Sequence, residues 1–357
     1  MSFYITKVRL QNFRNYGSFE FDVSPDTTII IGHNAIGKTN IIEAVQLLTM
    51  MESFRKPSWE EVTQWETDTA SFSLEAVEDK RQIEIECRIE DGKRTYFLNG
   101  KKRNGKELKG ILPATLFIPD DLIIIKGAAE RRRDALDAIG TQISATYLAL
   151  KNDYEKVVRQ RNILLKDDDA PQDLLDSWTA SLISIGSLFM AKRQSLFALL
   201  RARFIETYRY LSPQDSVDME YIPSWDLREH HYAPEEAFER LLIDLAAEER
   251  GRRTTVLGPH KDDIRVFLNG RNARQFASQG QQRLLVLAWK LAELDVLEEI
   301  TGKRPVLLLD DVMSELDAQR RGMFLSYIKG RTQTIITTTN REYFPEDVLK
   351  VALVMQL

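Results

Sequence analysis

Three short motifs, widely separated along the chain, constrain the fold more than any other feature of this sequence. The first, Gly32-His33-Asn34-Ala35-Ile36-Gly37-Lys38-Thr39, fits the phosphate-binding P-loop pattern at every required position. The second begins at Ser278, 239 positions after Thr39, and the third is an apolar run, residues 306–309, that ends on Asp310 and Asp311. A simple P-loop fold does not need so long an interval. We therefore expect one ATPase head whose middle admits a second lobe.

The residues around the P-loop favour a nucleotide site. Residues 28–31 are typical of a buried strand, and the segment after the loop is typical of an apolar core helix. Gly32 and Gly37 let backbone N–H groups face a phosphate, Lys38 reaches the β- and γ-phosphates, and the Thr39 hydroxyl ligates Mg²⁺. The alternative is a glycine turn with an incidental lysine. The predicted ATP-binding residues of this segment are Gly32, Asn34, Gly37, Lys38, Thr39 and Asn40.

Two acidic residues close the later apolar run. A buried parallel strand that ends in acids places them at the carboxyl edge of the sheet, where such folds bind ligands. We expect Asp310 and Thr39 to hold Mg²⁺, and we expect Asp311 and Lys38 to be catalytic, with Asp311 orienting the attacking water. The alternative role of Asp311 is to cap the helix that follows. Aspartate is shorter than the glutamate that most such ATPases carry here, so we expect slow hydrolysis.

The segment Ser278-Gln279-Gly280-Gln281 opens a strongly apolar helix, predicted over residues 281–300. The simpler interpretation is that Ser278 caps this helix. A second interpretation keeps the cap and adds nucleotide binding by Ser278, Gly280 and Gln281, because the helix N-terminus attracts a γ-phosphate. One chain cannot easily present both its P-loop and this helix to the same nucleotide. We therefore expect an ATP-dependent homodimer with two nucleotides between opposite faces.

The sequence pattern changes twice along the chain. Alternating segments with Asp-Gly and Asn-Gly turns dominate the first part and predict short strands and hairpins. From about 120 to 250, apolar residues recur at helical spacing, and strand signals return after Gly258. We therefore predict an α/β protein with an ATPase head of mixed sheets around a P-loop core, residues 1–119 plus 251–357, and an inserted, mostly helical lobe, residues 120–250.

The net charge of −5 hides local contrast. Residues 131–166 include eight basic and four acidic side chains, and residues 192–209 include five basic and one acidic. Such stretches are usually solvated helix faces. Two of them in one predicted lobe favour a surface that binds a polyanion.

The composition and the N-terminal sequence indicate the cellular compartment of the protein. The single cysteine, Cys87, excludes an internal disulfide, and the four scattered histidines do not favour a zinc site. No continuous apolar run reaches the roughly 18–20 residues of a membrane span. The N-terminus lacks a signal-peptide pattern. We expect a cytoplasmic protein with no membrane segment.

Taken together, the motifs resemble those of the SMC-like branch of the ABC ATPases, and within it the RecF family. The resemblance covers nearly the whole chain, and its most specific stretches are Arg159-Gln160-Arg161-Asn162 and Gly258-Pro259-His260, which the wider ABC superfamily does not require. One departure is Ala128-Ala129, where a proline-containing turn is expected. A second is the lack of a convincing glutamine in the loop that links the lobes, for which Asp120 or Asp121 is the substitute.

The resemblance implies a role in recombinational DNA repair. Family members bind duplex DNA without sequence preference, favour gapped DNA, dimerise on ATP, and hydrolyse it slowly in a DNA-dependent reaction. They work with RecR and RecO to place RecA on gapped DNA. The candidate DNA contacts here are Arg131, Arg132, Arg133, Arg159 and Arg161, each of which could instead form an ion pair.

The segment Gly258-Pro259-His260-Lys261 allows two interpretations. We favour a rigid turn in which His260 bonds to the backbone, and the alternative is a contact with DNA or a partner. Two other classes of protein share some motifs: an ATPase that drives a nuclease, and a transporter subunit. The first needs clustered metal-binding acids outside the head, and the second needs a membrane-partner surface, for which the lobe is too long and too basic.

Overall fold

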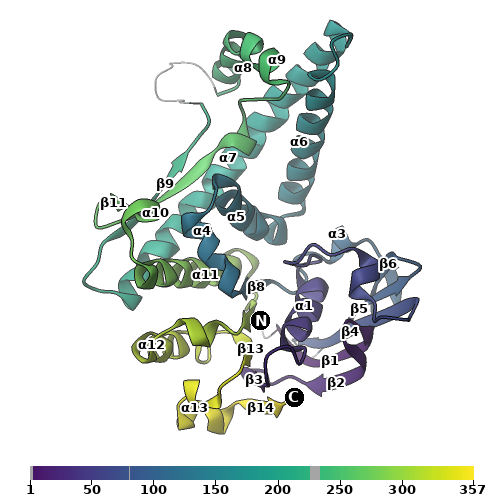
Figure 1. Ribbon diagram of the computed structural model, residues 1–357, viewed down its shortest axis with the longest axis vertical. Coiled ribbons are helices and arrows are strands. Elements are labelled where there is room, and N and C mark those ends of the chain that lie inside the picture. Colours follow the sequence, from purple (N-terminus) through teal and green to yellow (C-terminus); the bar gives the residue numbers. More distant parts are fainter. Residues whose placement is uncertain (1–2, 80, 226–233) are drawn as a thin grey trace. The chain divides into compact units, whose positions relative to one another are not determined.

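The computed structural model describes residues 3–79, 81–225 and 234–357, and it forms two compact units (Figure 1). Unit 1 comprises Met1–Leu122 and Arg283–Leu357, and unit 2 comprises Ile123–Gln282. The first boundary is close to residue 120, where the sequence pattern changes. Residues 251–282, which we expected in the head, belong to unit 2 because their strand pairs with a strand of that unit.

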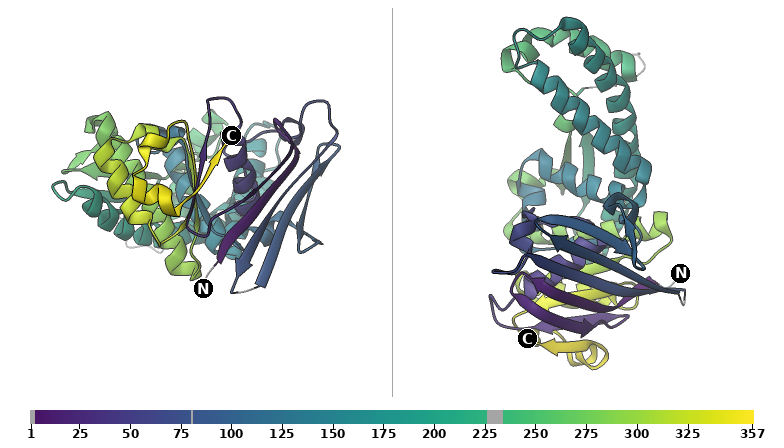
Figure 2. Two further views of the ribbon diagram at one scale, coloured as in Figure 1. Left: turned by 90° about the horizontal axis from the view of Figure 1, so that it is seen from below. Right: turned by 90° about the vertical axis from the view of Figure 1, so that its right-hand side faces the viewer.

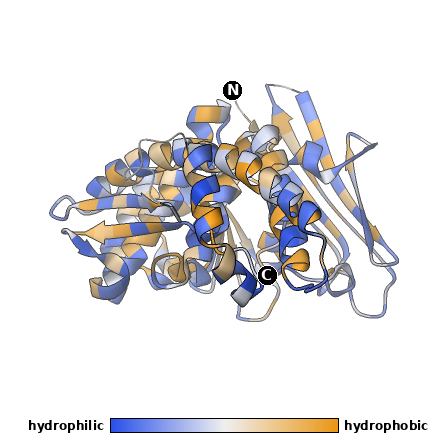
Figure 3. Ribbon diagram, turned by 90° about the horizontal axis from the view of Figure 1, so that it is seen from above, coloured by the Kyte–Doolittle hydropathy of each residue, from blue (hydrophilic) through white to orange (hydrophobic). Residues whose placement is uncertain are grey.

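Unit 1 contains an antiparallel sheet of six strands in the order β2-β1-β4-β5-β6-β7. Hydrophilic and hydrophobic residues alternate along its long strands (Figure 3), as expected for a sheet with one face on a core and one face in water. The strands are β1 (Phe3–Phe13), β2 (Tyr16–Asp22), β4 (Thr69–Glu78), β5 (Arg81–Glu90), β6 (Lys93–Leu98) and β7 (Lys101–Arg103).

A second sheet in unit 1 is parallel and has the order β14-β3-β13-β12-β8. Its inner strands are buried along almost their whole length, which explains the continuous apolar run of β12, while the threonines of β13 are buried as well. The strands are β3 (Thr27–Ile31), β8 (Ala114–Phe117), β12 (Val306–Asp310), β13 (Gln333–Thr338) and β14 (Leu353–Gln356).

Helix α1 (Lys38–Thr49) contacts strands of both sheets of unit 1 (Figure 2). Ile41, Ile42, Val45 and Leu48 are all fully buried. A helix packed on two sides needs apolar residues on most of its faces, which is why its sequence lacks a polar stripe. The P-loop that precedes α1 is thereby fixed to the core of the unit.

The other helical elements of unit 1 are short, apart from two. Helix α11 (Gln279–Thr301) has its first four residues in unit 2 and the rest in unit 1, and α12 (Ala318–Ile328) follows β12. The short ones are α2 (Trp59–Val62), α3 (Gly105–Leu108), α13 (Glu346–Val351) and the 3-10 helices η1 (Pro119–Leu122), η3 (Val312–Glu315) and η4 (Arg341–Tyr343).

Unit 2 is mostly helical but also has a three-stranded antiparallel sheet in the order β11-β10-β9. The sheet was not expected between residues 120 and 250, where β9 lies. Its strands are β9 (Val217–Ile222), β10 (Asp263–Leu268) and β11 (Arg271–Asn272). The helices are α4 (Ile123–Lys126), α5 (Ala129–Ile143), α6 (Ala145–Leu164), α7 (Gln172–Leu211), α8 (Pro234–Asp244), α9 (Ala246–Arg252), α10 (Ala273–Phe276) and η2 (Pro259–Lys261).

Among the described residues, α7 alone is long and apolar enough to cross a membrane, judged by length and composition. Our sequence prediction considered only continuous apolar runs. In α7, serine, threonine and glycine residues interrupt the apolar sequence, although the helix itself is continuous. One face of α7 packs in unit 2, beside α6, and residues of that face recur at helical spacing. They include Leu182, Phe189, Arg193, Leu196, Leu200 and Phe204.

Candidate active site

The P-loop connects the end of β3 to the start of α1 in unit 1. The Gly32 N–H donates to the Thr338 carbonyl of β13 at 3.1 Å. Gly37 has φ +118°, and a Cβ atom at this position would lie 2.5 Å from Asn15 Nδ2. Both the backbone angle and the close approach require glycine. Asn15 Nδ2 in turn donates to the Ile36 carbonyl at 2.9 Å, so the β1–β2 turn supports the loop.

Lys38 is held over the loop that precedes it. Its Nζ donates to the Gly32 carbonyl at 2.7 Å and to the His33 carbonyl at 2.8 Å. Only 6% of the residue is exposed. The ammonium group therefore lies within the curve of the P-loop, where the motif predicts the phosphates of a nucleotide.

The two residues predicted to hold Mg²⁺ are brought together across 271 residues of sequence. Thr39 Oγ1 donates to Asp310 Oδ1 at 3.0 Å. Thr337 Oγ1, on the neighbouring strand β13, donates to the same carboxylate oxygen at 2.7 Å. Because β3, β13 and β12 are parallel neighbours, their carboxyl ends meet at one edge of the sheet.

Asp311 follows β12 in a left-handed conformation with φ +52°. Its backbone N–H donates to the Thr337 carbonyl at 3.1 Å, which fixes the residue at the sheet edge. Its side chain does not cap η3, so the alternative role in capping is not seen. Burial raises the pKa of Asp311 above its ordinary value, and the positive charge of Lys38 opposes that rise.

One buried oxygen at this edge is unsatisfied. Asp311 Oδ1 has no hydrogen-bond partner among the residues that the structure describes. Buried polar atoms are normally satisfied, so an orphan here fits a site that binds a polar group. Together with a buried ammonium group and the paired Thr39 and Asp310, it fits the donor set for a nucleotide and a divalent cation.

A buried carboxylate behind the P-loop has a role that our sequence analysis did not assign. Glu43 on α1 has a fully buried side chain and pairs with Arg14 at 2.7 Å and with Arg55 at 2.8 Å. Arg55 also donates to Asn40, which donates to Asn15. A glutamate between apolar neighbours of a predicted core helix is the sequence signal that marks this position.

The predicted cap of α11 is confirmed. The Gln281 N–H donates to Ser278 Oγ at 3.3 Å, and the Ser278 N–H donates to Gln281 Oε1 at 2.9 Å, which together form a reciprocal capping pair. Ser278 is exposed and lies in unit 2, whereas the P-loop lies in unit 1. Nucleotide binding by Ser278, Gly280 and Gln281 stays a prediction.

Of the two candidate acids in the linking loop, Asp121 already contacts Ile118 and Lys290. Its Oδ2 accepts the Ile118 N–H at 2.9 Å, and its Oδ1 lies 3.4 Å from Lys290 Nζ on α11. Burial raises the pKa of Asp121 above its ordinary value. Asp120 is exposed and stays the candidate at this edge.

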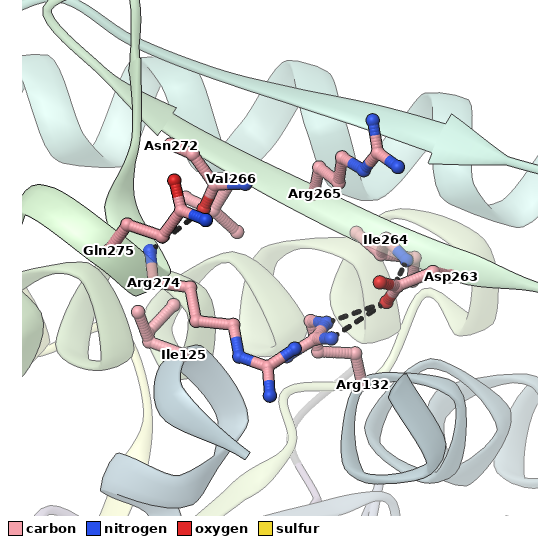
Figure 4. Close-up of a pocket in the computed structure, with 9 residues that line it drawn as sticks. All are labelled: Ile125, Arg132, Asp263, Ile264, Arg265, Val266, Asn272, Arg274 and Gln275. Atoms are coloured by element: carbon pink, nitrogen blue, oxygen red, sulfur yellow. Dashed lines mark hydrogen bonds and ion pairs between the residues drawn. The ribbon is translucent and has the colours of Figure 1, made fainter. Parts of the chain in front are cut away.

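Arg132 forms contacts inside unit 2, at the side of a cavity of about 420 Å³ (Figure 4). Its guanidinium donates to Asp263 at 2.8–2.9 Å and to the Ile124 and Gly127 carbonyls at 3.0–3.1 Å. Only 3% of the residue is exposed. These contacts argue against our expectation that Arg132 binds DNA.

Two further arginines of the predicted DNA surface also form contacts within unit 2. Arg161 is 4% exposed and forms a buried ion pair with Glu249 at 2.5 Å. Arg133 is partly buried and donates to the Asp262 carbonyl, and burial lowers the pKa of Arg133. This leaves Arg131 and Arg159, both exposed, as candidate contacts in this part of the chain.

The turn at Gly258 is closely packed, which supports the rigid turn that the sequence favours. Gly258 has φ +131°, and a Cβ atom there would lie 2.4 Å from Tyr154 Oη. His260 Nε2 lies 3.1 Å from the Thr255 carbonyl, so the predicted bond to the backbone is confirmed. Its Nδ1 lies 2.7 Å from Tyr154 Oη. Burial lowers the pKa of His260 to about 4, which keeps the ring neutral at pH 7.

The geometry defines an ATPase head of the ABC type: a P-loop beside an Asp-Asp strand end in a parallel sheet, next to an antiparallel sheet. The model of the RecF/RecN/SMC N terminal domain matches residues 4–356. An Smc head bound to the C-winged helix domain of ScpA has a TM-score of 0.55 at 17% identity, over 95% of this chain and 90% of that one, which is a likeness of fold.

Closer relatives are RecF proteins. The DNA replication and repair protein RecF of a Synechococcus strain is 35% identical over 99% of this chain and 96% of its own length. RecF of Bacillus mycoides is 34% identical over 98% and 95%. Solved structures of the recombination mediator RecF with ATPrS and with ATP have TM-scores of 0.89 and 0.88, at 30% and 31% identity, over 96% of this chain and 94% of each of theirs. The chain belongs to the RecF family of SMC-type ABC ATPases.

Proposed function

We propose that this chain is an ATP-dependent, dimerising DNA-binding protein of recombinational repair. It binds MgATP in unit 1, holds gapped or continuous duplex DNA without sequence preference, and acts in the cytoplasm with RecR and RecO to help load RecA. ATP hydrolysis is slow, stimulated by DNA, and serves as a switch.

The observation that carries this proposal is the pairing of Thr39 with Asp310 at 3.0 Å, beside a buried Lys38 and an unsatisfied Asp311 oxygen. Lys38 would neutralise the phosphates of a bound nucleotide, and Thr39 and Asp310 would hold its Mg²⁺. The metal would supply charge neutralisation at the phosphates. Asp311 would orient the attacking water through its free carboxylate oxygen.

Dimerisation is supported by the residues around Ser278 in unit 2. Ser278 is exposed at the start of α11, and Phe276, two residues earlier, is a large apolar side chain with 64% of its surface exposed. An exposed aromatic side chain beside a helix N-terminus, which attracts anions, is typical of a surface that another molecule covers. We assign that role to a second copy of the chain with ATP between the two.

Sedimentation with and without ATP tests this proposal. The wild type should shift from monomer to dimer when ATP and Mg²⁺ are added. Lys38→Ala should bind ATP roughly tenfold to a hundredfold more weakly, because a charged hydrogen-bonding group is lost, and should stay monomeric. Ser278→Arg should still bind ATP as a monomer but should not dimerise.

The matched control is Ser195→Arg, which adds the same charge at another exposed serine of unit 2, on α7. It should dimerise like the wild type. An unchanged monomer mass for the wild type with saturating ATP would contradict the proposed mechanism.

A further inference from the structure

One edge of the antiparallel sheet in unit 1 concentrates positive charge. Residues 93–109 include seven basic side chains and one acidic one. They form β6, the edge strand β7 and the short helix α3. Six basic residues of this segment are exposed, and we call the five other than Arg94 the β7 basic edge: Lys93, Lys101, Lys102, Arg103 and Lys106.

Most of these charges have no counter-ion in the part of the chain that the structure describes. Among the described residues, the four lysines of the β7 basic edge form neither an ion pair nor a side-chain hydrogen bond. Arg103 lies 4.0 Å from Glu107, and both side chains are largely exposed. Such a pair contributes little in water. The positive charge of this edge is therefore available to a partner.

The basic stretches of unit 2 differ in this respect. Arg132, Arg161 and Arg193 are buried in ion pairs, and Arg201 pairs with Asp218 at 2.7 Å on the surface. Among the described residues, six of the 13 basic side chains of those stretches form ion pairs, whereas the four lysines of the β7 basic edge form none. Residues 93–109 include seven basic side chains, and five of them form no ion pair among the described residues.

Protection of an edge strand is the simpler explanation for lysines at such a position. The opposite edge strand of the same sheet, β2, is protected with less charge. It carries Glu20 and Asp22, which both pair with Lys7. The β7 basic edge instead gathers like charges that repel one another. Repulsion of this kind is removed when a polyanion binds.

Side-chain stacking and a helix cap hold the backbone of this segment in place. Arg94 stacks over the rings of Trp59 and Tyr96, with 4.5 and 5.6 Å to the centroids. The Asn104 side chain accepts the Lys106 N–H at 3.1 Å and so caps α3. The lysines therefore project from fixed backbone positions, which suits contact with a regular series of phosphates.

We propose that the β7 basic edge contacts the phosphate backbone of duplex DNA. The proposal rests on the proposed DNA-binding function and adds a surface in unit 1 that the candidate arginines of unit 2 do not include. Lysine ammonium groups contact phosphates as point charges and read no base sequence. Each contact releases condensed counterions, so binding through this edge weakens as salt rises.

The test is DNA affinity across salt concentration for two triple variants, measured with ATP on a labelled duplex of about 30 base pairs. Lys101→Gln/Lys102→Gln/Lys106→Gln removes three charges from the β7 basic edge. Arg304→Gln/Lys329→Gln/Lys350→Gln removes three exposed charges elsewhere in unit 1. ATP affinity and melting temperature of both variants report that the fold and the nucleotide site are intact.

The edge variant should bind at least about tenfold more weakly near 100 mM salt, and its slope of log affinity against log salt should fall by about 2–3, as three lost phosphate contacts require. The control should stay within about twofold of the wild type.

Equal affinity and slope for the two variants, with a wild type that binds DNA, would overturn this surface and leave the proposed function standing. A wild type that binds no duplex at any salt would overturn both. Unchanged DNA affinity with weaker binding to purified RecR would assign the edge to a protein partner and would also overturn the proposal.

Discussion

Glu293 on α11 is a carboxyl group with 6% exposure, next to Lys290 and close to Asp121. Burial raises the pKa of Glu293 to about 7, against the opposing effect of Lys290. A carboxyl group whose pKa is higher in the folded state than in the unfolded state binds more protons when folded. Its contribution to stability is therefore greatest at low pH and declines as pH rises from about 4.5 to about 7.

Glu293→Gln removes this titration. Relative to the wild type, the variant should gain stability as pH rises through that window, by about 3 kcal/mol in total, because the penalty of charging a buried carboxyl is absent. Urea unfolding at pH 4.5, 5.5, 6.5 and 7.5 measures the difference. Glu299→Gln, at an exposed position on the same helix, is the control for replacing a carboxyl group by an amide. A constant difference across pH would contradict the prediction.

The roles of residues in a sequence motif were predictable. The roles of charged residues outside the motifs were not, because these roles depend on whether the side chain is buried. Lys38, Thr39, Asp310 and Asp311 come together as expected, because each is set by the end of a strand or the start of a helix. Arg161 was assigned to a DNA surface from a charge run. It lies seven positions after Tyr154 and four after Val157, on the same buried face of α6, and helical spacing carries this signal.

At the scale of elements, the pair between Arg161 and Glu249 ties α6 to α9 inside unit 2. Arg161→Met leaves a buried carboxylate without its partner, so we expect the free energy of unfolding to fall by about 3–5 kcal/mol. The double variant Arg161→Met/Glu249→Leu removes both charges and should recover most of that loss. Chemical denaturation measures both effects.

Arg252→Met is the matched control, because Arg252 pairs with Glu248 on the surface of the same helix α9, with 68% and 41% of the side chains exposed. Its effect should be below about 1 kcal/mol. Equal losses for Arg161→Met and Arg252→Met would show that the buried pair has no special role in stability.

Elements with strong local patterns were predictable, and elements defined by distant partners were not. Alternation and turn dipeptides predicted β4, β5 and β6, and the apolar run predicted β12. Strand β9 lacks an adjacent hairpin partner, since it pairs with β10, whose first residue Asp263 lies 41 positions after its register partner Ile222. Local sequence cannot reveal such a pairing, and the expected boundary at residue 250 was misplaced for the same reason.

At the scale of the whole molecule, DNA affinity should depend on both nucleotide and salt. With ATP, binding to gapped duplex should be tighter than with ADP, because only the dimer presents two sets of basic residues. Affinity should fall by at least about 100-fold between roughly 50 and 200 mM salt, as expected for several phosphate contacts.

Fluorescence anisotropy on gapped and continuous duplex, with each nucleotide, measures these differences. Lys38→Ala is the control and should give the ADP value under every condition. Equal affinity with ATP and ADP would separate DNA binding from the nucleotide site and contradict the proposed switch.

The position of β3 in its sheet has a consequence for biosynthesis. Strand β3 lies between β13 and β14, which occur near the other end of the chain, whereas unit 2 is a single continuous stretch. On the ribosome, unit 2 emerges whole while the strand that carries the P-loop still lacks both of its neighbours. The nascent chain must therefore keep an open, apolar sheet edge until translation has passed Gln356, and during that interval it is a natural client for chaperones.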